Sequence, residues 1–123
     1  MVRILLVDDH PGFLHIMSAE LTSEGYEVIT ALNGKQALQK IEECNPDLVL
    51  LDIMMPVMNG FDTLARLREG SALPVIVLSS DVYNRAQAMQ LGADDFIVKP
   101  FEAGELLEKI YNLVPGELPV DPY

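Results

Sequence analysis

The sequence has few basic residues and almost no cysteine. Eight Lys and Arg face 19 Asp and Glu among 123 residues, which gives a formal net charge of −11. This balance argues against direct contact with nucleic acid or an anionic membrane, because both require basic groups that neutralise phosphates. The single cysteine, Cys44, excludes an intramolecular disulfide and is typical of a reducing compartment.

Long hydrophobic runs are absent as well. The longest apolar stretches, such as residues 4–7 and 48–51, are too short to cross a bilayer. The N-terminus lacks the charged, apolar and small-residue segments of a secretory signal. A chain of this length forms one domain, so we expect a single soluble domain in the cytoplasm.

Five short apolar runs recur along the chain, at residues 4–7, 28–29, 48–51, 75–78 and 96–98. Most are continuous rather than alternating, as expected for strands covered on both faces in a parallel sheet. The segments between them place apolar residues at helical spacing. This alternation predicts an α/β fold, with a doubly wound five-stranded parallel sheet and helices on both faces.

The segment boundaries agree with this interpretation. Asn33 is placed to cap the second helix, and Gly25 and Gly92 follow the first and fourth helices at positions suited to a left-handed cap. The fourth helix, expected over residues 83–91, has the least apolar surface, so we expect it to be held most loosely. Residues 1–114 are predicted to form the domain, and the proline-rich residues 115–123 an irregular tail or the start of a linker.

Polar residues follow four of the predicted strands, at the edge where ligands bind to an open parallel sheet. They are Asp8 and Asp9 after the first run, Asp52 after the third, Ser79 after the fourth and Lys99 after the fifth. Three carboxylates this close repel one another unless a cation offsets them. Carboxylate ligands with a free position for a phosphate oxygen describe a Mg²⁺ site better than a zinc site.

Each of these residues also has a structural interpretation. The first two aspartates could cap the next helix, expected to start near Phe13, and Asp52 could begin a turn. Lys99 could form an ordinary ion pair, and Ser79 could be a strand-end turn residue. Their coincidence at one edge favours a functional site. His10 and His15, near the acidic pair, are expected to be surface or helix residues rather than metal ligands.

Asp52 follows a wholly apolar strand and should project from a rigid strand end. An aspartate in such a position can attack phosphorus and form an acyl phosphate. A metal ion beside it would neutralise charge on the transferring phosphoryl group. Lys99 can add a second positive charge, and Ser79 a hydroxyl donor.

Four blocks of sequence together resemble a bacterial two-component response-regulator receiver domain of the chemotaxis-receiver type. They are residues 4–9, 51–60, 74–79 and 92–101, in the order and at the separations of that family. The resemblance covers nearly the whole chain and implies the flavodoxin-like (βα)5 receiver fold. It also implies that Asp52 accepts a phosphoryl group from a histidine kinase or phosphotransfer protein. The implied Mg²⁺ ligands are three carboxylates and one backbone carbonyl, those of Asp8, Asp9, Asp52 and Met54.

The resemblance assigns further roles near the phosphoryl group. Lys99 and Ser79 would bind its oxygens, and the Lys99–Pro100 bond would be cis. Ser79 and Phe96 would be the switch residues, with Phe96 turning inward as the hydroxyl moves; the alternative is a plain core aromatic. The protein would then be a signalling switch that catalyses only its own phosphoryl transfer and autodephosphorylation.

The output implied by the resemblance is control of a partner or an attached effector. A homodimer could form through the fourth helix, the last strand and the last helix, with ion pairs involving Asp94, Asp95, Glu105 and Lys109. The alternative is that these residues form a solvated charged face. We expect no direct contact with nucleic acid or membrane.

Three other functions compete with this interpretation. A haloacid-dehalogenase-type phosphatase requires an acid two residues after the nucleophile, where this chain has Met54. A flavodoxin-like cofactor site requires hydroxyls and glycines after the first strand, where this chain has two aspartates that would repel a phosphate. A degenerate receiver that is never phosphorylated is disfavoured by the complete set of acidic, hydroxyl and lysine residues.

Overall fold

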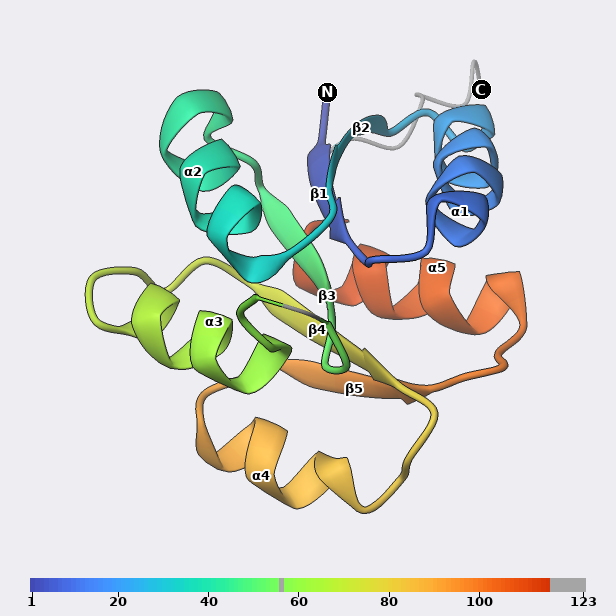
Figure 1. Cartoon of the computed structure of the whole chain (residues 1–123). Helices are drawn as coiled ribbons and strands as arrows, with labels where there is room; N and C mark the ends of the chain where they lie inside the picture. Colours follow the sequence, from blue (N-terminus) through green and yellow to red (C-terminus); the bar gives the residue numbers. More distant parts are fainter. Residues whose placement is uncertain (56, 116–123) are drawn as a thin grey trace.

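The computed structural model describes residues 1–55 and 57–115, arranged as alternating strands and helices (Figure 1). The strands are β1 Arg3–Val7, β2 Glu27–Ala31, β3 Leu48–Asp52, β4 Val75–Ser79 and β5 Asp95–Val98. The helices are α1 Pro11–Ser23, α2 Gly34–Cys44, α3 Gly60–Arg68, α4 Asn84–Gln90 and α5 Ala103–Leu113. Of the predicted tail at 115–123, only Pro115 lies within the described residues.

All five strands are parallel and pair in the order β2-β1-β3-β4-β5. The chain therefore winds from β1 to one edge, returns across β1 to β3, and continues to the other edge. This confirms the predicted doubly wound sheet. The strand order reverses between β1 and β3, which is the point where such sheets bind their ligands.

Helices cover both faces of the sheet, with α1 and α5 on one face and α2, α3 and α4 on the other (Figure 1). Alternate residues of each central strand therefore enter two separate cores, as with Leu50 on the α1 side and Leu51 on the α3 side. Every residue of β3 and β4 is buried, whereas β2 at the sheet edge is partly exposed. The continuous apolar runs reflect this two-sided cover.

The predicted helix ends are confirmed at several positions. The side chain of Asn33 accepts a hydrogen bond from the backbone N–H of Gln36 at 2.9 Å. Gly25 and Gly92 adopt φ angles of 94° and 105°, which favour glycine because other residues are strained there. Helix α1 begins earlier than expected, at Pro11, because proline fits the first turn of a helix.

Helices α1 and α4 differ in how much they bury. Helix α1 has 13 residues and buries Leu14, Met17 and Leu21, whereas α4 has seven residues and buries only Ala88. The predicted scarcity of apolar surface on the fourth helix is therefore confirmed. Its looser attachment remains a prediction about its motion.

Candidate functional site at the carboxyl edge of the sheet

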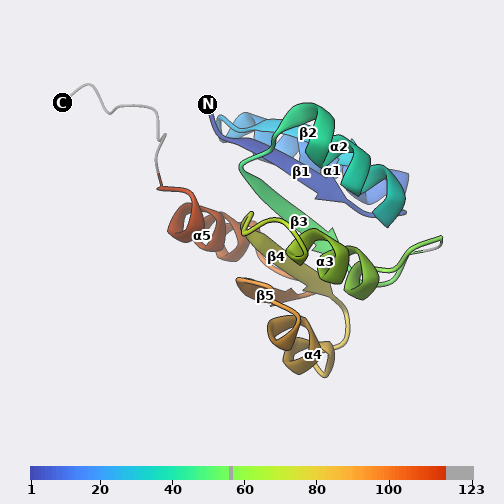
Figure 2. The same ribbon diagram turned by 90° about the vertical axis from the view of Figure 1, so that its left-hand side faces the viewer.

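The parallel strands bring the predicted site residues to one edge, where the arrowheads of the central strands lie in Figure 2. Asp8 follows β1 directly, Asp52 is the last residue of β3, Ser79 is the last residue of β4, and Lys99 follows β5. These four residues are far apart in sequence but lie at the ends of four neighbouring strands of the sheet. The side chains can therefore act on the same ligand.

Lys99 is the positive centre of this edge. Its Nζ atom lies 2.7 Å from Oδ2 of Asp8, which is a short charge-assisted hydrogen bond, and 3.6 Å from Oδ1 of Asp52. The same ammonium lies 4.2 Å from the centre of the Phe13 ring, a cation–π distance. The ion-pair interpretation of Lys99 is therefore confirmed, and it is compatible with a later contact to phosphate.

Asp8 is buried completely, and its carboxylate contacts Lys99 and His10. Its Oδ1 accepts the backbone N–H of His10 at 2.9 Å and lies 3.0 Å from Nδ1 of the same residue. The N-cap residue of helix α1 is His10, and no side chain forms a capping hydrogen bond there. Neither Asp8 nor Asp9 therefore caps this helix. The proposed capping role of Asp8 and Asp9 is therefore wrong; the turn at His10 directs the Asp8 carboxylate toward the sheet edge.

His10 is a surface residue, as expected from the sequence, and its ring also lies against the acidic pair of this site. Its Nδ1 lies 3.0 Å from Oδ1 of Asp8 and 3.1 Å from Oδ1 of Asp9, while its side chain is 74% exposed. The hydrogen bond with Asp8 and the charges of both carboxylates raise the pKa of His10 above its ordinary value. The signal that could have found it is the spacing Asp-x-His, which places a side chain over the preceding carboxylate in an Asx-type turn.

Asp52 is 5% exposed, and its environment opposes ionisation. Burial raises the pKa of Asp52 above its ordinary value, the charge of Lys99 lowers it, and the charges of Asp8 and Asp9 raise it further. The carboxylates therefore repel one another, as expected from the sequence. A single ammonium does not balance three acidic groups, so the edge has an excess of negative charge.

The hydroxyl of Ser79 lies on the α4 side of the edge. It accepts hydrogen bonds from the side-chain Nδ2 of Asn84 at 2.9 Å and the backbone N–H of Asp81 at 3.0 Å. It also donates to the backbone carbonyl of Asp81 at 3.3 Å. The strand-end turn interpretation of Ser79 is therefore correct for this conformation, in which the hydroxyl is bound to the start of α4.

The sequence matches the family described as response regulator receiver domain over residues 4–111. The chain belongs to this family. It is a receiver domain of the kind found in two-component systems, where receivers interact with histidine kinases and bind Mg²⁺ during phosphorylation.

Known relatives agree with this assignment. The receiver domain is 43% identical over 112 residues to the transcriptional regulatory protein KdpE of Mycobacterium tuberculosis, covering 89% of this chain and 50% of KdpE. It is 41% identical over 114 residues to the probable transcriptional regulator ycf27 of Cyanophora paradoxa, covering 91% of this chain and 48% of ycf27. The chain thus spans about half the length of these relatives.

Solved structures show the same fold. The response regulator TrrA of Thermotoga maritima, in complex with Mg²⁺–BeF, matches with a TM-score of 0.86 and 39% identity, covering 93% of this chain and 100% of that one. The chemotaxis protein CheY4 of Vibrio cholerae matches with a TM-score of 0.86 and 31% identity, covering 93% and 99%. Membership in the receiver family displaces the dehalogenase and flavodoxin-type alternatives.

The acidic edge of this receiver fits a divalent cation. One oxygen of Asp9, Oδ1, is buried without a hydrogen bond of acceptable geometry, although His10 Nδ1 is only 3.1 Å away. Ligand atoms of Asp8, Asp9 and His10 all lie within 4.8 Å of one another. An unsatisfied buried carboxylate oxygen beside a fully buried carboxylate is a donor set that Mg²⁺ suits. Met54 lies in the loop after β3 and is 71% exposed. Its backbone carbonyl as a Mg²⁺ ligand stays a prediction.

The predicted aromatic switch residue is already turned inward. Phe96 on β5 is 2% exposed and packs in the core under α2, α3 and α4. The Lys99–Pro100 bond is cis, as the resemblance implied. This conformation therefore combines a buried aromatic residue with a hydroxyl that is bound to α4.

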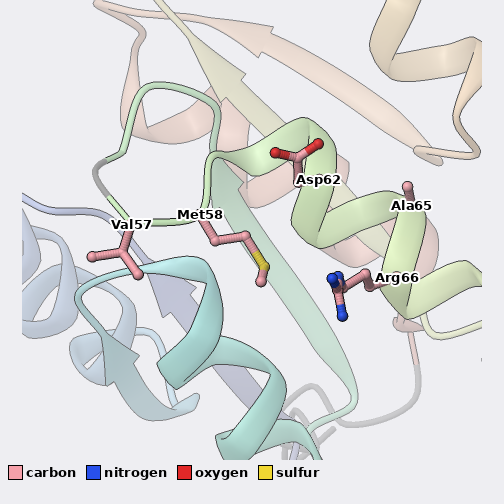
Figure 3. A pocket seen from close by; sticks show the side chains of 5 residues that line it. All are labelled: Val57, Met58, Asp62, Ala65 and Arg66. Carbon is pink, nitrogen blue, oxygen red and sulfur yellow. The ribbon is translucent and has the colours of Figure 1, made fainter.

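One hollow on the surface of the described residues lies away from this edge. It measures about 500 Å³ and is lined by Val57, Met58 and α3 residues including Asp62 and Arg66 (Figure 3). None of the predicted site residues lines it. The charged groups converge instead at the open edge of the sheet, where a phosphoryl group and a cation can reach them. No helix of the described residues is both long and apolar enough to span a bilayer.

Proposed function

We propose that Asp52 accepts a phosphoryl group from a histidine kinase or phosphotransfer protein in a Mg²⁺-dependent reaction. The observation that carries this proposal is the position of the Asp52 carboxylate. It is 5% exposed at the end of the fully buried strand β3, and its Oδ1 lies 3.6 Å from the Lys99 ammonium that Asp8 also binds. A nucleophile held on a rigid strand beside a fixed cation is pre-organised for attack on phosphorus.

In the transfer step, an Oδ atom of Asp52 attacks phosphorus and forms a P–O bond as the P–N bond to the donor histidine breaks. Lys99 is close enough to Asp52 to pair with an oxygen of the arriving phosphoryl group. Mg²⁺, when bound, would neutralise further charge on that group, and Asp8, Asp9, Asp52 and the carbonyl of Met54 would hold it. The Asp8–Lys99 ion pair keeps the ammonium at the edge before the donor arrives.

The phosphorylated state would be transmitted through Ser79 and Phe96 to a partner or an attached effector. We also propose that a homodimer could form through α4, β5 and α5. Exposed apolar residues on or beside these elements support a dimer interface there. Tyr83 is 88% exposed, Val98 37% and Tyr111 41%. The charged residues support it less, because Asp95 pairs with Lys109 and Asp94 pairs with Arg68 within the same chain.

The remaining functional statements are proposals about residues 1–123 alone. The receiver would act in the cytoplasm as a switch that catalyses only its own phosphoryl transfer and autodephosphorylation. The net charge of −11 supports the absence of direct nucleic-acid contact by this domain. This proposal concerns residues 1–123 only, since a relative 39% identical over 110 residues is named as the DNA-binding response regulator MtrA.

Incubation with acetyl phosphate and Mg²⁺, followed by intact-mass measurement, tests the proposal. We expect the mass of one phosphoryl group to be added in a form that hydroxylamine removes. The adduct should be lost in Asp52→Asn and in the presence of a chelator. Asp62→Asn changes an exposed aspartate at the start of α3 and serves as the matched control.

An adduct that still forms in Asp52→Asn would show that another residue is the phosphoryl acceptor. An adduct that forms equally well in the presence of the chelator would show that the reaction does not require Mg²⁺. The absence of any adduct with acetyl phosphate and with a phosphorylated histidine donor would instead support the degenerate receiver, which binds partners without being phosphorylated.

A further inference from the structure

The hydroxyl of Ser79 uses its full hydrogen-bonding capacity on the turn after β4 and on the first residue of α4. It accepts from Asn84 Nδ2 at 2.9 Å and from the Asp81 N–H at 3.0 Å, and it donates to the Asp81 carbonyl at 3.3 Å. A hydroxyl has one donor and two acceptor sites, so none remains for another ligand. Ser79 is 2% exposed, so water does not readily replace these partners.

Asn84 is distinct among these partners. The contacts with Asp81 join neighbours two residues apart, whereas the Asn84 amide reaches across from the first residue of α4. It is also the only side chain that bonds to Ser79 within the described residues. Helix α4 buries only Ala88, so this bond is one of few ties between the start of the helix and β4.

The aromatic switch residue does not account for the position of the hydroxyl. Phe96 is already buried, with 2% of its surface exposed. Its inward position and the α4-bound position of Ser79 coexist in the same structure. The restraint on Ser79 therefore lies in its own hydrogen bonds.

We propose that Asn84 is a positioning residue that holds the Ser79 hydroxyl away from the phosphoryl site. The inference rests on the proposed function, in which Ser79 donates to a phosphoryl oxygen on Asp52. For that contact the hydroxyl hydrogen leaves the Asp81 carbonyl, and the hydroxyl oxygen turns toward Asp52, so that Asn84 Nδ2 loses its acceptor. The Asn84 side chain is half-buried, so water can hydrate the released amide. The Asn84–Ser79 bond thus opposes capture of the phosphoryl group.

This exchange couples the phosphoryl site to α4 in both directions. A phosphoryl group that binds the Ser79 hydroxyl releases the start of the helix. Conversely, a partner that draws Asn84 away from Ser79 strengthens the hold on the phosphoryl group, because coupling between two binding events is reciprocal. The thin packing of α4 allows this response at little cost.

Beryllofluoride, a stable mimic of the phosphoryl group, tests the inference when titrated at saturating Mg²⁺ and followed by ¹⁹F NMR or calorimetry. We expect Asn84→Ala to bind it about two- to tenfold more tightly than the wild type, the change expected when one neutral hydrogen bond is removed from the unliganded state. In a Ser79→Ala background, Asn84→Ala should produce no further change. This double-mutant cycle isolates the pair from any general effect on the helix.

Gln87→Ala is the matched control, because it changes an exposed side chain of the same helix. It should leave beryllofluoride affinity unchanged, and thermal unfolding should show that all variants are folded. Unchanged or weaker binding in Asn84→Ala would overturn the inference, as would an equal effect with and without Ser79. A wild type that fails to bind beryllofluoride with Mg²⁺ would instead count against the proposed function itself.

Discussion

The two halves of the carboxyl edge are held by different forces. On the β1–β3 side, full charges meet at short distances, with Asp8 and Asp52 both facing the Lys99 ammonium. On the β4–α4 side, neutral hydrogen bonds connect Ser79 to Asn84. Charges in a partly buried site interact strongly, whereas a neutral hydrogen bond contributes only about 1 kcal/mol net. We infer that the β1–β3 side is a reactive half that stays in place, whereas the β4–α4 side is a responsive half that can exchange hydrogen-bond partners.

Packing follows the same division. Strand β3, which ends at Asp52, is buried at every residue, whereas α4 buries a single alanine. A strand buried on both faces cannot move without disturbing two cores. A short helix with one buried side chain can move at small cost.

The largest expected difference is in local opening. Amide hydrogens exchange when their helix or strand opens locally. We expect the free energy of opening to be lower for α4 than for β3 by roughly several kcal/mol, because α4 buries so little apolar surface. Native-state hydrogen exchange measured by NMR gives both values in one experiment. Equal protection of the two elements would contradict the comparison.

Removal of the central cation should strongly destabilise the reactive half. Lys99→Ala leaves the fully buried carboxylate of Asp8 without its ammonium, so we expect a loss of about 3 kcal/mol in the free energy of unfolding. Lys109→Ala breaks the more exposed pair with Asp95 and should cost less than about 1 kcal/mol. Urea denaturation in a chelator measures both, and similar losses would show that burial does not distinguish the two pairs.

Mg²⁺ should stabilise the same half through the acidic pair. At a concentration one hundred times its Kd, the ion should add about 2.7 kcal/mol to the free energy of unfolding, since it binds the folded chain. Asp9→Asn should lose most of this gain, because the variant removes the charge of the carboxylate whose oxygen is buried without a hydrogen bond. Thermal unfolding at increasing Mg²⁺ tests this, and an undiminished gain in the variant would exclude Asp9 as a ligand.

A smaller effect is expected from the charge of Asp52 in the absence of metal. The pKa of Asp52 is raised in the folded protein, so the folded state holds this proton more tightly than the unfolded chain. Ionisation of Asp52 therefore costs stability as pH rises through the folded pKa. Asp52→Asn should be more stable than the wild type at pH 7, by about 1 kcal/mol.

The gain in Asp52→Asn should shrink as pH falls, and it should vanish below the ordinary pKa of an aspartate, where both states are protonated. Denaturation of both proteins in a chelator over a pH series measures it. A gain that is constant with pH would assign the effect to packing rather than to charge.

Much of the fold follows from local patterns. The apolar run at residues 48–51 could be recognised as a strand covered on both faces, and β3 is buried throughout. Asn33 could be recognised as a cap because a short polar side chain beside a helical stripe has few other roles. The start of α1 was misplaced because the turn at His10 and Pro11 depends on a contact with Asp8 as well as on helical periodicity.

The members of the site could also be predicted, but their pairings could not. Parallel topology places strand ends together, so Asp8, Asp52 and Lys99 were expected at one edge. Sequence alone does not show that Lys99 approaches Asp8 more closely than Asp52, or that His10 lies against both acidic neighbours. Asn84 was missed because an asparagine on a polar helix resembles any exposed residue until the neighbouring strand end is in place.

Hydrophobic periodicity and strand-end chemistry, both local properties of the chain, determined the architecture and the set of reactive side chains. Only the tertiary structure decided which carboxylate the lysine binds and which amide holds the hydroxyl of Ser79. The physical reason is range. A burial pattern can be recognised from residues that are close together in the sequence. A hydrogen bond or ion pair depends instead on distances of a few ångströms between segments that are far apart in the sequence.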